Sequence, residues 1–433
     1  MPDPEILEQM RGDWNGRAIE DARYYVAFGR RGQQDEEFFN SAADVVRSLE
    51  GELKRLPREI PPQARKALEV GCGPGRLMRP MSRNFGEIHG VDVSDEMIRL
   101  AQERFGGASG MRLYLTNGAD LSPVTSDYFD FVYSYAVFQH IPSRDVVLSY
   151  FDEIRRVLKT GGIARLQLNG LPPSTKAPDT WEGVRLSREE IADYARDHGF
   201  QLLALEGAGT QYLWTTWRKQ SAGWRASLKN GGPPARIQRS GDAHTGEPAV
   251  PQSGRFSYVS FWLERLSPDC DLNDLSVTFE GSAGDSCYIG PPEWGGLNQL
   301  NVLLPRGVRT GLVPVELLWL GKPLCPPVWL RIIPPGPAVP RIRSVNDALN
   351  LMAGTRIESR IIKLVVEDFA DAESVSALVD GQPGAKLEWF QTDALTGSFE
   401  INLHLPADIA PGGHQIELNN GSRRFAPIAI EVV

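Results

Sequence analysis

The sequence is poor in cysteine and has no long apolar run. Its 433 residues contain four cysteines, at positions 72, 270, 287 and 325, and they lie too far apart for a zinc knuckle. No apolar stretch approaches the roughly 18–20 residues that a membrane-spanning helix needs. The first residues, Met1–Glu5, lack the basic start and apolar core of a signal peptide. We therefore expect a cytoplasmic protein with no membrane span and no metal site.

Positive charge is also scarce. Lys and Arg number 46 against 55 Asp and Glu, which gives a net charge of −9. Such a balance provides no general attraction to nucleic acid or to an anionic membrane. The hydrophobic content of 41% is ordinary for a globular protein, but 433 residues exceed what one hydrophobic core usually holds. We expect two or three domains.

One stretch, Ala67–Arg76, indicates a nucleotide-binding turn. A short apolar run ends in Glu69 and opens into Gly-x-Gly-x-Gly at positions 71–75, typical of a buried strand that turns sharply into a helix. A second apolar strand ends in Asp92 about one helix later, as a βαβ unit requires. A dinucleotide fingerprint would need glycine at position 76, where Arg76 stands instead.

These residues resemble motif I and the following acidic motif of class I S-adenosylmethionine-dependent methyltransferases of type 11/12. The resemblance continues in the family's order through residues 115–121, 129–134, 137–142 and 157–162, and covers roughly the first half of the chain. It implies an α/β Rossmann-like domain with a seven-stranded, mostly parallel sheet. It also implies S-adenosylmethionine as cofactor and S-adenosylhomocysteine as product.

Each motif then has a physical task toward that cofactor. The backbone at Gly71, Gly73 and Gly75 would approach the methionine part closely, where a Cβ would obstruct it. Glu69 could accept a hydrogen bond from the ammonium group, and Asp92 could accept both ribose hydroxyls. The other predicted cofactor contacts in these motifs are Cys72, Arg76, Val93, Met97, Gly118, Ser134 and Tyr135, of which Val93 and Met97 would flank the adenine ring.

Two residues compete for the adenine amino group. Asn117 takes the position where the family often has an acid, and its amide oxygen can accept the bond uncharged. Asp120 is the rival, and its alternative role is a turn or helix cap.

An N-terminal helix is predicted over residues 5–31, where apolar side chains recur every three to four positions. It could simply pack on the sheet edge. The resemblance implies instead a segment that closes over the bound cofactor, with candidates Trp14, Arg17, Asp21, Tyr24 and Tyr25.

His140 follows the fourth predicted strand and has two readings. As a general base it would take a proton from an acceptor hydroxyl, and as a structural residue it would brace the following helix. Gln139 beside it is a candidate for the substrate pocket, as is Trp14 of the N-terminal helix. Trp181, in a proline-rich insert after the fifth strand, is another, with an ordinary core tryptophan as the alternative.

The second half changes character. Residues 1–218 would form the methyltransferase domain and residues 219–254 a linker or arm. Short strand-like runs then predict two all-β Ig-like sandwich domains, at 255–335 and 336–433, the first resembling IPT/TIG repeats over residues 298–321.

The sequence therefore predicts methyl transfer to a small-molecule, lipid or glycan acceptor. The β-domains would serve binding or assembly, with a carbohydrate or protein partner rather than nucleic acid. The alternative is a non-catalytic cofactor-binding or scaffolding protein whose Ig-like domains bind such a partner.

Overall fold

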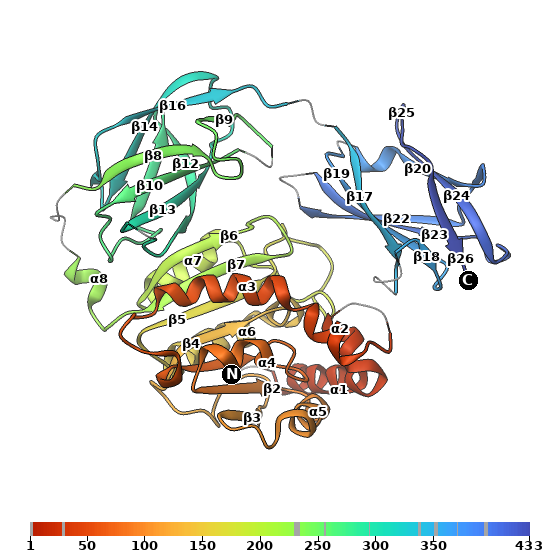
Figure 1. Ribbon diagram of the computed structural model, residues 1–433, viewed down its shortest axis with the longest axis horizontal. Coiled ribbons are helices and arrows are strands. Elements are labelled where there is room, and N and C mark those ends of the chain that lie inside the picture. The colour runs from red at the N-terminus through yellow and green to blue at the C-terminus, as the bar shows by residue number, and fades with distance from the viewer. Residues whose placement is uncertain are drawn as a thin grey trace. The chain divides into compact units, whose positions relative to one another are not determined.

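The computed structural model describes residues 3–27, 31–228, 234–254, 257–293, 295–336, 339–349, 354–369, 371–393 and 397–433 (Figure 1). Of the helix predicted over residues 5–31, positions 28–30 lie outside the described residues. Within the described part, no helix is long and apolar enough to cross a bilayer. The four cysteines are buried free thiols.

The N-terminal sheet has the order β3-β2-β1-β4-β5-β7-β6. Neighbours among the first five strands are parallel, and β7 is antiparallel to both β5 and β6. This confirms the predicted Rossmann-like fold with a mixed sheet. The strands are β1 (Lys66–Val70), β2 (Glu87–Asp92), β3 (Met111–Leu115), β4 (Phe129–Ser134), β5 (Leu158–Leu168), β6 (Phe200–Glu206) and β7 (Leu213–Lys219).

Three helices begin where the sequence provides a serine cap. Ser94, Ser143 and Ser187 each accept a hydrogen bond from a backbone N–H in the first turn of α5, α6 and α7, and Ser187 forms a capping box with Glu190. The α-helices are α1 (Pro4–Ala27), α2 (Asp35–Asn40), α3 (Ala43–Glu52), α4 (Met78–Met81), α5 (Asp95–Phe105), α6 (Arg144–Val157), α7 (Arg188–Asp197) and α8 (Trp224–Ser227). The short 3-10 helices are η1 (Leu53–Arg55), η2 (Pro62–Ala64), η3 (Ser82–Asn84), η4 (Phe138–His140) and η5 (Ala372–Ser374).

Strands after residue 235 build a first β-domain. They are β8 (Arg236–Asp242), β9 (Ala249–Pro251), β10 (Tyr258–Glu264), β11 (Leu275–Phe279), β12 (Ser282–Ile289), β13 (Leu297–Leu303), β14 (Gly311–Trp319), β15 (Lys322–Pro323) and β16 (Val328–Ile333). Part of the expected linker is thus folded, because β8 pairs with β10 and β9 with β16. Most residues of β8 are exposed or half-buried and only Ile237 is a large apolar one, so the segment carries little apolar pattern.

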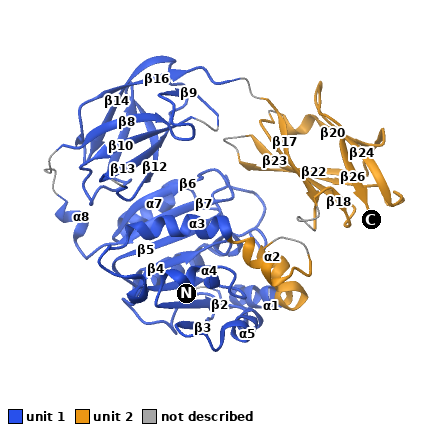
Figure 2. Cartoon of the chain, in the orientation of Figure 1, with its two compact units in different colours: residues 1–15, 43–336 blue, residues 16–42, 337–433 orange. Residues whose placement is uncertain are grey.

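The chain divides into two compact units (Figure 2). Unit 1 holds residues 1–15 and 43–336, and unit 2 holds residues 16–42 and 337–433. The first β-domain therefore lies in the same compact unit as the Rossmann-like domain, and the predicted domain bounds stay a prediction. The two share one hydrophobic core, and Tyr288 of β12 pairs with Ala204 of β6.

Unit 2 contains two further sheets. One has the order β17-β19-β23-β22, and the other is β18-β26-β24-β20-β21 with β25 beside β24. Buried side chains of both sheets, such as Leu364 and Leu418, form one core. This is a two-sheet β structure, and its Ig-like character stays a prediction. The strands are β17 (Arg341–Asp347), β18 (Arg356–Ile357), β19 (Ile361–Glu367), β20 (Val375–Val379), β21 (Gln382–Pro383), β22 (Lys386–Asp393), β23 (Ser398–His404), β24 (Gly412–Asn420), β25 (Arg423–Arg424) and β26 (Ile428–Val432).

A buried ion pair of the Rossmann-like domain contacts the first β-domain. Arg55 and Glu52 are both less than 10% exposed, and their charged atoms lie 2.6 Å apart. Arg55 also donates to the carbonyl of Ile289 at the end of β12, at 2.7 Å. Its positive charge, with that of Arg165, outweighs the effect of burial and lowers the pKa of Glu52.

Replacing Arg55 should therefore destabilise unit 1 strongly. In Arg55→Met the carboxylate of Glu52 stays buried without its partner, which costs about 3–5 kcal/mol. Denaturant unfolding followed by tryptophan fluorescence measures the loss. The control is Arg47→Met, which breaks the exposed Arg47–Asp44 pair on α3 and should change the free energy of unfolding by less than about 0.5 kcal/mol. Equal effects of the two variants would contradict this role for Arg55.

Candidate functional site

The glycine turn after β1 is held by the end of β2. The N–H groups of Gly71 and Cys72 both donate to the carbonyl of Val91, at 2.8 and 2.9 Å. Gly71, Gly73 and Gly75 have φ values of +72°, +51° and +85°, which side-chain-bearing residues rarely adopt.

Packing also requires glycine at two of these positions. A Cβ on Gly71 would lie 2.2 Å from Val137, and one on Gly75 would lie 2.3 Å from Phe105. The sequence argument gave only the close approach of a ligand as the reason for these glycines. At positions 71 and 75 the structure adds backbone conformation and internal packing as reasons in their own right.

Asp92 lies at the carboxyl end of β2 and faces the turn. Its carboxylate accepts the N–H of Gly73 at 2.8 Å on one oxygen and the N–H of Ser94 at 2.9 Å on the other. Burial raises the pKa of Asp92, although these hydrogen bonds oppose the shift. Each oxygen keeps a lone pair, so the carboxylate can still accept hydroxyl groups of a ligand.

Glu69 is almost fully buried beside the turn, on β1. Tyr133 of β4 donates its hydroxyl to Glu69 at 2.9 Å. Burial raises the pKa of Glu69 to about 8, although Tyr133 and the charge of Arg76 oppose the shift. The carboxyl is therefore mainly protonated at neutral pH. A cationic group placed next to it would favour its charged form.

Arg76 and Tyr135 belong to a stack of planar groups at the same edge. The guanidinium of Arg76 lies 5.6 Å from the Tyr135 ring, which stacks on Trp214 with centroids 5.6 Å apart. Arg165 lies over the Trp214 ring at 4.7 Å and pairs with Glu206. The sequence motifs predict Arg76 and Tyr135. They do not indicate Trp214 and Arg165, because these residues lie on β7 and β5 outside the motifs.

The two candidates for the adenine contact bind each other. Asn117 donates to Asp120 at 2.6 Å, and its amide oxygen accepts the N–H groups of Ala119 and Asp120 at 2.8 and 3.0 Å. Both lone pairs of that oxygen are used by the turn. Asp120 accepts the N–H of Ser122 on its other oxygen and keeps acceptor capacity. The geometry therefore favours Asp120 as the acceptor for a ligand and Asn117 as the turn former.

The remaining predicted cofactor residues lie around the turn in buried or half-buried positions. Met97 is buried in the first turn of α5, and its N–H donates to Ser94. A Cβ on Gly118 would lie 2.9 Å from Val93, which places these two side by side. The Ser134 hydroxyl is fully buried and donates to the carbonyl of Val70, so it is engaged within the sheet. The Cys72 thiol is buried, and burial raises its pKa.

The first half of α1 crosses the carboxyl edge of the sheet. Arg11 donates to the carbonyl of Thr116 after β3, and Asn15 binds Ser94 and Asp95 after β2. On the other side, Thr180 donates to Asp13. These contacts place the segment over the strand ends that carry Asp92. Arg11, Asp13 and Asn15 were missed, because polar residues on a helix give no periodic signal.

Helix α1 is kinked at Asp21, whose backbone is not helical, with φ −168° and ψ 88°. The Asp21 carboxylate accepts the N–H of Tyr24 at 3.0 Å and of Gly32 at 2.9 Å, and so caps the following turn. Tyr24 and Tyr25 contact each other edge to face, and Arg31 lies over Tyr24 at 4.5 Å. These residues and Arg17 belong to unit 2, and their binding to a cofactor stays a prediction.

Three of the predicted acceptor-side residues gather around His140. The Trp14 ring lies 5.5 Å from the His140 ring and the Trp181 ring 6.1 Å from it. Gln139 contacts His140 directly, with the amide nitrogen 3.1 Å from Nε2. His140 is 5% exposed and Trp181 is 48% exposed, so Trp181 is not an ordinary core residue.

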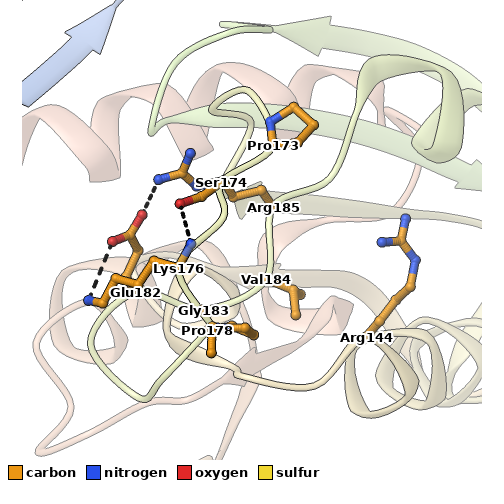
Figure 3. Close-up of a pocket in the computed structure, with 10 residues that line it drawn as sticks. Arg144, Pro173, Ser174, Lys176, Pro178, Glu182, Gly183, Val184 and Arg185 are labelled. Atoms are coloured by element: carbon orange, nitrogen blue, oxygen red, sulfur yellow. Dashed lines mark hydrogen bonds and ion pairs between the residues drawn. The ribbon is translucent and has the colours of Figure 1, made fainter.

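The insert after β5 also lines a cavity of about 210 Å³ (Figure 3). Arg144, Lys176 and Arg185 bring positive charge to it, and each pairs with a carboxylate: Arg144 with Glu190, and the other two with Glu182. The lining residues come from position 144 and the range 173–185 and include neither His140 nor Trp181. This cavity is therefore separate from the aromatic group around His140.

This region is similar to a known class of protein domain. Residues 68–166 match the family model described as a methyltransferase domain. Together with the strand order of the sheet, this match shows that the N-terminal part of the chain contains a methyltransferase domain. The matched segment runs from β1 to β5 and includes the glycine turn, Asp92 and His140.

Individual relatives are similar over part of their length. The chain is 29% identical over 135 residues to an uncharacterised protein of Methanocaldococcus jannaschii, covering 31% of this chain and 57% of that protein. It is 30% identical over 141 residues to phosphoethanolamine N-methyltransferase 2 of Caenorhabditis elegans, covering 31% and 32%, and 30% identical over 105 residues to trans-aconitate 2-methyltransferase of Rhizobium rhizogenes, covering 24% and 38%. The chain thus spans about a third to just over half of these relatives.

Among solved structures, a methyltransferase of Aquifex aeolicus aligns with 18% identity and a TM-score of 0.30, over 40% of this chain and 96% of its own. Geranyl diphosphate C-methyltransferase of Streptomyces coelicolor aligns with 15% identity and a TM-score of 0.37, over 50% of this chain and 100% of its own.

The raised pKa of Glu69 predicts a pH-dependent stability. As pH rises from about 4.5 to 8, the unfolded chain loses this proton freely while the folded protein retains it, so the free energy of unfolding falls. In Glu69→Gln this contribution disappears, and the difference between the two proteins should grow to about 4 kcal/mol at pH 8. Denaturant titrations at several pH values measure it. Glu103→Gln, at an exposed carboxylate on α5, is the control, and parallel pH profiles of wild type and Glu69→Gln would contradict the prediction.

Proposed function

We propose that the chain transfers a methyl group from S-adenosylmethionine to a small-molecule, lipid or glycan acceptor. One observation carries the proposal: the turn at residues 71–75 and the carboxylate of Asp92 meet at the carboxyl edge of a sheet with this strand order. Ligands of open α/β sheets bind at this edge, outside the carboxyl ends of the strands. The match of residues 68–166 to a methyltransferase domain supports it.

The side chains at this edge suit the parts of the donor. Glu69 is a buried carboxyl that a ligand ammonium group would pair with, and Asp92 retains acceptor capacity for two ribose hydroxyls. Asp120 can accept from the adenine amino group, next to the apolar side chains of Val93 and Met97. Bound here, S-adenosylmethionine would supply a methyl carbon already activated by its sulfonium.

The chain's own contribution is then positioning and exclusion of water. Collinear attack on a sulfonium methyl needs little acid–base help, so orientation in a shielded site supplies most of the effect. The first half of α1 provides the cover, fixed by Asn15 on one side and Asp13 on the other. The acceptor would lie toward the aromatic group formed by Trp14, His140 and Trp181.

Relatives with this domain methylate chemically different acceptors, as the names trans-aconitate 2-methyltransferase and phosphoethanolamine N-methyltransferase state. The choice of acceptor would therefore depend on residues outside the shared motifs. The insert at 171–186 supplies such residues, among them Trp181 beside His140. A rigid group of rings favours an acceptor with a flat or apolar part. A carbohydrate or protein partner of the β-domains remains part of the proposal.

Calorimetric titration of the full chain tests the donor. We expect micromolar binding of S-adenosylmethionine and S-adenosylhomocysteine and no binding of NAD. Absence of binding to both methionine compounds would favour the scaffolding alternative and contradict the proposed reaction.

Replacing Asp92 tests the placement of the ribose. Asp92→Ala removes the acceptor for two hydroxyls and should weaken S-adenosylhomocysteine binding by at least about 100-fold, since bonds to a charged group are worth about 1.5–3 kcal/mol each. Asp92→Asn keeps the size of the side chain and shows whether the loss follows from the charge or from a collapsed turn. Glu103→Ala, at the far end of α5, should bind like wild type. Unchanged affinity in Asp92→Ala would place the ribose elsewhere.

A further inference from the structure

We propose that Gln167 and Gln139 are positioning residues that hold His140 neutral, with its proton on Nδ1. The three side chains form one hydrogen-bonded series that runs from the backbone of Ala136 to the backbone of Trp181. All three are buried, with 0%, 6% and 5% exposure for Gln167, Gln139 and His140. Water therefore has little access to these groups, and a donor or acceptor that faced a like group would stay unsatisfied.

The direction of the series is set first at Gln167. Its amide oxygen accepts the N–H of Ala136 at 2.9 Å, and its amide nitrogen donates to the carbonyls of Leu168 and Gln211 at 2.8 and 3.0 Å. A backbone N–H can only donate and a backbone carbonyl can only accept. Turning the Gln167 amide over would oppose like groups at all three contacts, so its orientation is fixed by the main chain.

Gln167 then fixes Gln139, and Gln139 fixes the ring. The Gln167 nitrogen also lies 2.9 Å from the Gln139 oxygen, so its two N–H groups serve three acceptors and one of them is shared. Because this nitrogen can only donate, the Gln139 oxygen faces it and the Gln139 nitrogen faces His140 Nε2 at 3.1 Å. Since an amide nitrogen only donates, Nε2 must accept and carries no proton. At the other side of the ring, Nδ1 lies 2.8 Å from the carbonyl of Trp181 and must donate.

This assignment decides between the two readings of His140 from the sequence. The lone pair of Nε2 that a general base would use is already occupied by Gln139, so the ring braces the insert. Gln139 supports the same segment through its main chain, because its carbonyl accepts the N–H of Gly183 at 2.7 Å. A Cβ on Gly183 would lie 2.6 Å from the backbone of Ile141, so the insert packs tightly here.

The consequence for acceptor binding rests on the proposed function, whereas the protonation state of His140 does not. If the chain is a methyltransferase, Gln167 positions the Trp14–His140–Trp181 group through Gln139 and does not itself contact the acceptor. An acceptor would then meet an uncharged wall, and its own proton would leave to solvent or to another group.

Nitrogen-15 NMR of the histidine-labelled full chain at pH 7.5, without cofactor, tests the inference. The spectrum of a His140→Phe variant assigns the resonances of His140 among the six histidines. We expect a protonated Nδ1 and an unprotonated Nε2 in the wild type. A dominant Nε2–H form, or a doubly protonated ring, would overturn the proposal.

Two variants test the series itself. Gln139→Glu places a carboxylate acceptor against Nε2 and should convert His140 to the doubly protonated form at the same pH. Gln167→Leu frees the Gln139 amide to turn over and should give both tautomers in place of one. Gln220→Leu is the control, because Gln220 donates to Gln201 elsewhere in unit 1 and should leave the His140 signals unchanged.

A His140 spectrum in Gln139→Glu identical to that of wild type would contradict the series even if wild type shows the expected tautomer. The calorimetric titration with S-adenosylmethionine is a separate measurement on the wild-type chain. Failure there with the expected tautomer would reject the proposed function and leave the inference about Gln139 and Gln167 in place.

Discussion

The site depends on one backbone carbonyl, that of Val91. By accepting the N–H groups of both Gly71 and Cys72, it ties the turn after β1 to the last residues of β2. The left-handed turn that results brings the N–H of Gly73 to the carboxylate of Asp92. Asp92 in turn fixes the start of α5 through Ser94, and Ser94 is one of the residues on which α1 docks through Asn15. The turn, the acid and the cover over them are thus consecutive consequences of the β1–β2 pairing.

The sequence predicts the parts of the site that are local. The glycine turn and the acid at the end of the second strand depend on residues within a few positions of each other, and the structure has both. The mostly parallel sheet also follows from the sequence, because the βαβ pattern and the resemblance to a known family imply it. Where the sequence left a choice, as between Asn117 and Asp120, only the hydrogen-bond partners distinguish the two.

What the sequence could not predict is long-range and polar. Gln167 lies on a strand whose pattern is apolar, and nothing nearby shows that its amide meets Ala136 and Gln139, about 30 residues away. The docking of α1 depends on Arg11, Asp13 and Asn15, which look like ordinary solvent-facing residues of a helix. The strands within 219–254 escaped notice for the same reason, since exposed side chains on β8 follow no apolar alternation.

The first β-domain belongs to the same compact unit as the Rossmann-like domain. The backbone of Leu202 on β6 donates to Asp271 and accepts from the N–H of Leu272, and Gln201 donates to the carbonyl of Cys270. Ending the chain after β7 would remove the partners of these groups on β6 and the Ile289 carbonyl to which Arg55 donates, and would expose the apolar core that the two domains share. Several such contacts lie at one boundary, so the first β-domain contributes to the stability of the Rossmann-like domain. The arrangement of Arg165, Trp214 and Tyr135 on the same strands depends on that boundary as well, which links the β-domain to the geometry of the candidate site.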